Sequence, residues 1–187
     1  RIVSYNEDAR MFLARPPVRR YDLIMGDAFN DYSVPYHLTT QEFNEQVQAW
    51  LAYGGLYMVN LIDGPRRDFL RAYVHTLEQT FAHVYVIPTI RTWRASPRVT
   101  FVVVATDTPL VTGDFQLIDG GDGEKLVAEM LLPERDVAAI LSEGRLALLT
   151  DRFAPVDQML APVFRGEAPE QEPAPADVPQ AGEVQAE

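Results

Sequence analysis

Apolar residues in the first third of the chain form short continuous runs separated by a stretch with helical spacing. The run at 22–26 predicts a strand that is apolar on both faces, as a central parallel strand is. Phe43 and Val47 then recur at helical spacing behind Thr39, a predicted helix N-cap with Glu42 three residues on. The pair Gly54-Gly55 predicts the end of that helix, and 56–61 predicts a second strand.

Further elements flank this strand–helix–strand unit. A strand is predicted at 2–5, and a helix at 8–14 that Pro16-Pro17 stops. Pro65 can open another helix at its first turn. The β-branched segments 84–87 and 99–105 lie too close together for a crossover helix, so they should pair antiparallel.

The predicted domain organisation has three parts. Residues 1–110 form an α/β sheet domain, and 111–165 form a mainly helical extension with helices at 126–132 and 134–142 and a strand at 146–149. Residues 166–187 consist of Pro, Ala, Glu and Gln with almost no large apolar side chain, so they should be a disordered acidic tail. The length of 187 residues suits one domain with a substantial core.

Charge and composition narrow the functional classes. The formal net charge is -11, and the segment 166–187 holds six acids and no Lys or Arg, so the rest is only mildly acidic. This argues against sequence-independent nucleic-acid binding, which needs basic patches, and permits a cationic substrate. The chain has no cysteine, hence no disulfide or thiolate metal site. No apolar run approaches the roughly 20 residues that span a membrane.

Asp27 is the first candidate for chemistry. It follows the strand predicted at 22–26, and open parallel sheets bind ligands outside the carboxyl ends of their strands. A carboxylate there can bind an amine cation or accept an amine proton; the alternative is a cap on a nearby turn. Asp119-Gly-Gly-Asp-Gly is interpreted as a turn, and no metal site is predicted because His75 and His83 have no second ligand at a useful spacing.

Several motifs together resemble the spermidine synthase family. They are R-I-V-S-Y-N-E-D-A-R-M-F-L at the amino end, D-A-F-N-D from Asp27, P-Y-H-L-T-T-Q-E-F with G-G before a strand, I-P-T with Trp93, and L-T-D-R-F-A-P-V-D-Q-M-L from Leu149. The likeness is greatest to bacterial spermidine-synthase-like proteins fused to membrane transporter segments. It implies a class I methyltransferase-like (Rossmann-like) α/β sheet, mostly parallel with a final antiparallel pair.

The resemblance also implies site roles and ligands. Asp27 would be the catalytic base, Asp31, Tyr32 and Trp93 would contact substrate, and Asp8 with Ala9 would hold the adenine of the co-substrate. The alternative is that Asp8 is an N-cap for the helix that follows it. The implied reaction is aminopropyl transfer from decarboxylated S-adenosylmethionine to a polyamine such as putrescine, without a metal, in the cytoplasm or on the cytoplasmic side of a membrane.

Departures from the family pattern leave alternatives open. Asn30 stands where a second Asp is usual, Ile90 replaces a Tyr, and no Gly-rich nucleotide loop occurs. The resemblance therefore covers the carboxyl-terminal half of the domain, and the amino-terminal half is an expected partner, with a homodimer left open. The alternatives are an S-adenosylmethionine-dependent methyltransferase and a degenerate, non-catalytic nucleoside-binding domain. His37 is interpreted as part of a structural turn.

Overall fold

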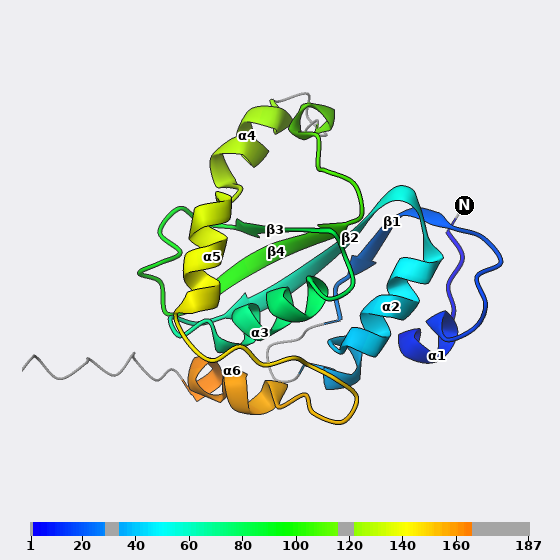
Figure 1. The fold of residues 1–187 in the computed structure, drawn as a ribbon, viewed down its shortest axis with the longest axis horizontal. Helices are drawn as coiled ribbons and strands as arrows, with labels where there is room; N and C mark the ends of the chain where they lie inside the picture. Colours follow the sequence, from blue (N-terminus) through cyan, green and yellow to red (C-terminus); the bar gives the residue numbers. More distant parts are fainter. Residues whose placement is uncertain (1, 29–33, 116–121, 166–187) are drawn as a thin grey trace, which may run out of the picture.

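The computed structural model describes residues 2–28, 34–115 and 122–165, which form one α/β sheet domain with helices packed on it (Figure 1). The strands are β1 (Tyr21–Gly26), β2 (Leu51–Asp63), β3 (His83–Pro88) and β4 (Val99–Thr106). The helices are α1 (Ala9–Leu13), α2 (Gln41–Trp50), α3 (Asp68–Leu77), α4 (Gly123–Met130), α5 (Glu134–Ser142) and α6 (Val156–Arg165), with short 3-10 helices at Tyr36–Leu38 and Thr112–Asp114. The predicted tail and the turn at Asp119 lie outside the described residues.

The sheet order is β1-β2-β4-β3. β1 pairs with β2 in parallel, whereas β4 runs antiparallel to both β2 and β3. Three strands therefore run the same way and only β4 is reversed within the described sheet. This confirms the predicted class I methyltransferase-like fold and the antiparallel pairing of the last two strands.

The glycine pair proved to belong to a strand and not to a helix end. α2 ends at Trp50, and Gly54 and Gly55 lie inside β2. The register between β1 and β2 jumps there, from Tyr21↔Leu51 to Leu23↔Leu56. Gly54 has φ of 73°, and a Cβ on Gly55 would lie 2.9 Å from the carbonyl oxygen of Tyr21, so both positions need glycine for a bulge.

Two predicted strands are absent from the described structure. The segment 2–5 is extended but joins no sheet, and its apolar side chains, including Ile2, are exposed. The segment 146–149 joins no sheet either, and Leu149 bonds to helices instead: it accepts from the Gln41 N–H and donates to the Thr76 hydroxyl. The N-cap of α2 also moves by one residue, because the Thr39 hydroxyl donates to the Tyr36 carbonyl while Thr40 accepts from the Phe43 N–H.

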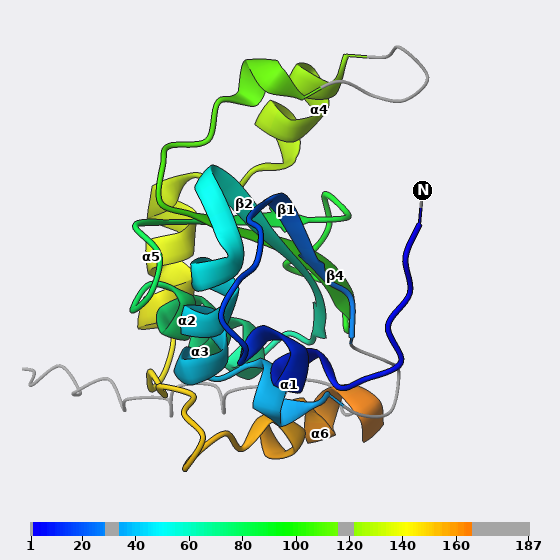
Figure 2. The ribbon, with the colours of Figure 1, turned by 90° about the vertical axis from the view of Figure 1, so that its right-hand side faces the viewer.

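Helices cover one face of the sheet. Alternate residues of β2 from Gly55 onward are buried toward α2 and α3, and Figure 2 shows α2, α3 and α5 together on that side. α5 and α6 contact α3 and so enclose it. The opposite face carries apolar side chains that are exposed or half-buried: Leu23, Met25, Leu56, Met58, Ile62 and Val102. The sheet thus has apolar residues on both faces and a helical layer on one.

Asp63 joins the end of β2 to the start of α3. The helix begins at Asp68, not at Pro65 as the sequence predicts, and its N-cap Arg67 is left-handed with φ of 51°. The capping role passes to Asp63, whose buried carboxylate accepts from the Gly64 and Leu70 N–H groups, both at 2.7 Å. Burial raises the pKa of Asp63 to about 6, although the hydrogen bonds oppose the shift.

The Asp63 cap should give a measurable pH dependence. The pKa of Asp63 is about 3.9 in the unfolded state and is raised to about 6 in the folded state, so between these values the folded state binds more protons. The resulting stabilisation of the folded state is fully present below about pH 3.9 and is lost as pH rises through about 6. Relative to Asp63→Asn, which does not titrate there, the wild type should lose at most about 3 kcal/mol of unfolding free energy between pH 4 and 7.

Urea unfolding of both proteins at pH 4, 5, 6 and 7 measures this difference. All other carboxylates are shared, so their titration cancels. At pH 7 Asp63→Asn should still be the less stable protein, by about 1–3 kcal/mol, because its amide nitrogen cannot accept from the second N–H. A difference that stays constant across the series would show that the pKa of Asp63 is the same in the folded and unfolded states.

Candidate functional site

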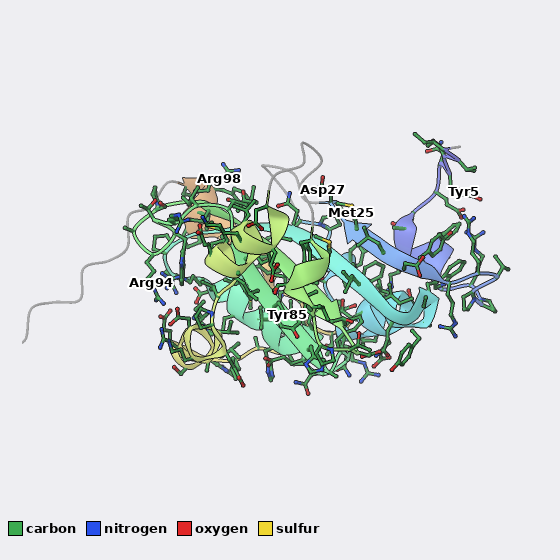
Figure 3. All side chains as sticks on the ribbon, turned by 90° about the horizontal axis from the view of Figure 1, so that it is seen from above. Tyr5, Met25, Asp27, Tyr85, Arg94 and Arg98 are labelled. Carbon is green, nitrogen blue, oxygen red and sulfur yellow. The ribbon has the colours of Figure 1, made fainter. Side chains whose placement is uncertain are left out.

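Asp27 lies at the carboxyl end of β1, where the sheet opens to solvent. Its side chain is exposed, and its Oδ1 accepts from the Asn60 amide of β2 at 3.0 Å. β1 and β2 are parallel, and Gly26 pairs with Val59. Asp27 and Asn60, which follow this pair along the two strands, therefore lie at the same edge of the sheet. Figure 3 shows Asp27 beside Met25 at this edge. A neutral amide leaves most lone pairs of the carboxylate available to a cation.

A cavity of about 260 Å³ opens beside Asp27. It lies between α1, α2 and the helix-covered face of β1 and β2. Its walls are mostly apolar and come from Ala9, Leu13, Ile24, Met25, Gly26, Asp27, Ala28, Leu38, Phe43, Val47, Tyr57 and Val59. The predicted base and one of the predicted adenine-contacting residues, Ala9, therefore line the same cavity.

Asp8 caps α1 and also contacts the loop before α2. Its Oδ1 accepts from the Met11 N–H at 3.0 Å, and its Oδ2 lies 3.1 Å from His37 Nε2. The Met11 N–H is the main cause that lowers the pKa of Asp8, with a smaller contribution from His37. The alternative interpretation of Asp8 as a helix cap is thus observed, and its role toward adenine stays a prediction.

Arg10 and Asp151 form a network that the sequence reasoning missed. Arg10 donates to the His37 carbonyl at 2.6 Å, to the Thr40 hydroxyl at 3.0 Å and to Asp151 at 2.5 Å. Thr40 in turn donates to Asp151 at 2.9 Å, and the Asp151 N–H donates to Glu42. Asp151 thereby fastens the carboxyl-terminal segment to α1 and to the start of α2.

This network gives a structural role to Asp151 of the L-T-D-R-F motif. Partial burial tends to raise the pKa of Asp151, but hydrogen bonds from Arg10 and Thr40 outweigh it and lower the value. The only available signal was the motif itself, since 141 positions separate Arg10 from Asp151. Asn60 was missed as well, although its position near the end of the parallel neighbour of β1 could have suggested it.

Trp93, a predicted substrate-contacting residue, does not line the cavity. Trp93 is 7% exposed and packs edge-on against Phe101. The guanidinium groups of Arg67 and Arg94 lie over its ring, 4.9 and 4.3 Å from the centroid. Trp93 therefore has a packing role, and a substrate contact stays a prediction. Asp31 and Tyr32 lie outside the described residues.

Metal and membrane features are not found in the described part of the chain. Within residues 2–28, 34–115 and 122–165, no group of three or more His, Asp or Glu side chains could hold a metal ion. Across the same ranges, no helix combines the length and apolar character that crossing a bilayer requires.

Comparison with solved structures places the fold. A probable spermidine synthase from Corynebacterium glutamicum superimposes with a TM-score of 0.60 at 22% identity, covering 76% of this chain and 52% of that one. The spermidine synthase from Thermotoga maritima matches with a TM-score of 0.52 at 18% identity, covering 72% and 48%. The chain has a spermidine-synthase-like fold. No protein-family model and no curated protein matches the sequence.

The chain spans about half the length of these two structures, since it covers 52% and 48% of them. At identities of 22% and 18% the likeness concerns the fold.

Removing the Asp151 side chain should loosen the segment that follows α5 without unfolding the sheet. Asp151→Ala deletes the acceptor of Arg10 and Thr40, and because the side chain is 45% exposed the expected loss is only about 1 kcal/mol. Hydrogen exchange should accelerate in 149–165 and in the first turn of α2. Asp157→Asn, an exposed acid in α6, is the matched control and should change neither quantity.

The pH dependence gives a second readout of Asp151. Its folded-state pKa is lowered, so its contribution is fully present above an unfolded value of about 3.9 and is lost as pH falls through the folded value. The stability difference between wild type and Asp151→Ala should shrink in that acid range. Unchanged exchange in 149–165 would mean that the segment is held by its apolar contacts alone.

Proposed function

We propose that this chain is part of a transferase in which Asp27 handles an amine substrate and the cavity beside it receives the nucleoside of an adenosyl co-substrate. The reaction is aminopropyl transfer from decarboxylated S-adenosylmethionine to a polyamine such as putrescine. The observation that supports it best is the exposed Asp27 carboxylate at the end of a parallel strand, on the rim of an apolar cavity, in a spermidine-synthase-like fold.

The chemistry assigns one task to each side of the cavity. The neutral amine nitrogen attacks the aminopropyl carbon, the bond from that carbon to the sulfonium breaks, and methylthioadenosine leaves with the electron pair. The proton released by the new amine passes to the Asp27 carboxylate, which Asn60 orients. Asp8 and Ala9 contact the adenine, and Asp31, Tyr32 and Trp93 contact the polyamine.

The open side of the sheet supports a polypeptide partner. β1 is an edge strand, so its outer N–H and C=O groups have no strand partner in the described sheet, and Leu23 and Met25 project from it 46% and 68% exposed. Apolar residues on both faces are typical of sheets that helices cover twice. We expect an amino-terminal half-domain to pair with β1 and cover this face, in a cytoplasmic protein whose longer form carries a membrane transporter segment.

The role of Asp27 is tested in a chain that includes this half-domain. Asp27→Asn keeps the shape of the side chain but cannot accept the proton, so turnover should fall about 10²–10⁴-fold. Binding of methylthioadenosine, measured by calorimetry, should change little in Asp27→Asn and weaken in Asp8→Asn. If Asp27→Asn transfers aminopropyl groups normally, or the wild type shows no transfer to any amine, methyl transfer or nucleoside binding alone becomes the better function.

The partner is tested on the 187-residue chain. Alone it should bind methylthioadenosine more weakly than micromolar, and its exposed face should bind a hydrophobic dye. Leu23→Lys and Met25→Lys should each reduce dye fluorescence without lowering the unfolding midpoint, because both side chains already face solvent. The control for these two β1 substitutions is Lys125→Met, which lies on α4. Micromolar nucleoside binding by this chain alone would refute the need for a partner.

A further inference from the structure

The cavity beside Asp27 has a second polar group at its buried end. Of the side chains that line it, only Asp27 and Tyr57 carry polar atoms. Asp27 is exposed, whereas Tyr57, on β2, is 3% exposed. A ligand that entered past the carboxylate would therefore meet apolar walls and then one hydroxyl.

The Tyr57 hydroxyl has a proton to donate. Tyr73 of α3 donates to the Tyr57 oxygen at 3.3 Å, so Tyr57 acts as the acceptor in that pair. Among the described residues, Tyr73 is the hydrogen-bond partner given for the Tyr57 hydroxyl, and because Tyr73 donates, that pair does not use the proton of Tyr57. Burial raises the pKa of Tyr57 to about 12, so the group remains a neutral O–H donor at physiological pH.

Gly26 keeps this hydroxyl uncovered. A Cβ at position 26 would lie 3.1 Å from the Tyr57 oxygen and 3.4 Å from Val59. Unlike Gly54, Gly26 does not have a positive φ, so its backbone conformation does not require glycine. The reason for glycine at this position is therefore space between β1 and the Tyr57 hydroxyl.

We propose that Tyr57 is a positioning residue that donates a hydrogen bond to the ligand in this cavity, and that the group bound there is apolar with one acceptor atom, such as a ring nitrogen. The inference rests on the proposed function, in which the same cavity takes part of the nucleoside. A buried hydroxyl left without an acceptor penalises ligands that lack one, so the cavity discriminates by an acceptor atom as well as by size.

A pair of small probes tests the hydrogen bond without any nucleoside. Pyridine and benzene have the same shape, and only pyridine carries an acceptor. Their dissociation constants for the 187-residue chain are measured by NMR titration at pH 7.5, where pyridine is neutral. The ratio of the benzene constant to the pyridine constant should fall about tenfold in Tyr57→Phe, because the difference in hydration between the probes cancels between the two proteins.

Matched variants separate binding from stability. Tyr57→Phe leaves the Tyr73 hydroxyl without its acceptor and should lower stability, so Tyr57→Phe/Tyr73→Phe is included and should show the same reduced ratio. Tyr73→Phe retains the Tyr57 hydroxyl and should keep the wild-type ratio. Gly26→Ala should weaken both probes, since its methyl group would occupy the space at the hydroxyl.

The outcomes distinguish this inference from the proposed function. A wild-type ratio retained in Tyr57→Phe, or failure of both probes to bind the wild type, overturns the role of Tyr57. A ratio that falls as expected, together with no nucleoside binding by the completed domain, supports Tyr57 as a hydrogen-bond donor and contradicts the proposed adenosyl co-substrate. Nucleoside binding by the completed domain, together with a ratio that is unchanged in Tyr57→Phe, supports the adenosyl co-substrate and overturns the role of Tyr57.

Discussion

The parallel pairing of β1 with β2 is the constraint on which the rest of the site depends. It brings Asp27 to Asn60, and it sets Gly26 on the same face as Tyr57 and Val59. A slip of one residue would exchange the two faces of β1 and remove both relations. The bulge at Gly54 and Gly55 absorbs the extra residues of β2, so the register is established before the strand reaches the site.

The helical layer connects the sheet to the carboxyl-terminal segment. Asp63 ends β2 and caps α3, and α5 and α6 pack against α3. From the other side, Asp151 returns to Arg10 and Thr40, the residues that position α1 and the start of α2. The cavity lies between these helices and the sheet, so residues 149–165 support it without lining it.

Local pattern predicted much of this fold. The helix at Glu134–Ser142 and the antiparallel pair β3 and β4 follow from spacing and β-branched residues, since those signals are contained within each segment. Competing tertiary contacts explain the errors. Thr39 and Thr40 are both good caps, and Thr40 wins where Arg10 and Asp151 meet. Likewise, a glycine pair signals a helix end or a bulge equally well until the neighbouring strand is known.

The two candidate carboxylates differ in a way that suits different ligands. Asp27 has a single neutral partner among the described residues and faces solvent, so it can receive a proton. Asp8 is held by the Met11 N–H, which lowers its pKa and favours a permanently ionised acceptor. A carboxylate has about four acceptor positions, and the cap and His37 use two of them, so Asp8 can also accept from an exocyclic amine. Capping and nucleoside recognition are therefore compatible in Asp8, and the cap fixes the orientation of its carboxylate next in sequence to Ala9, which lines the cavity.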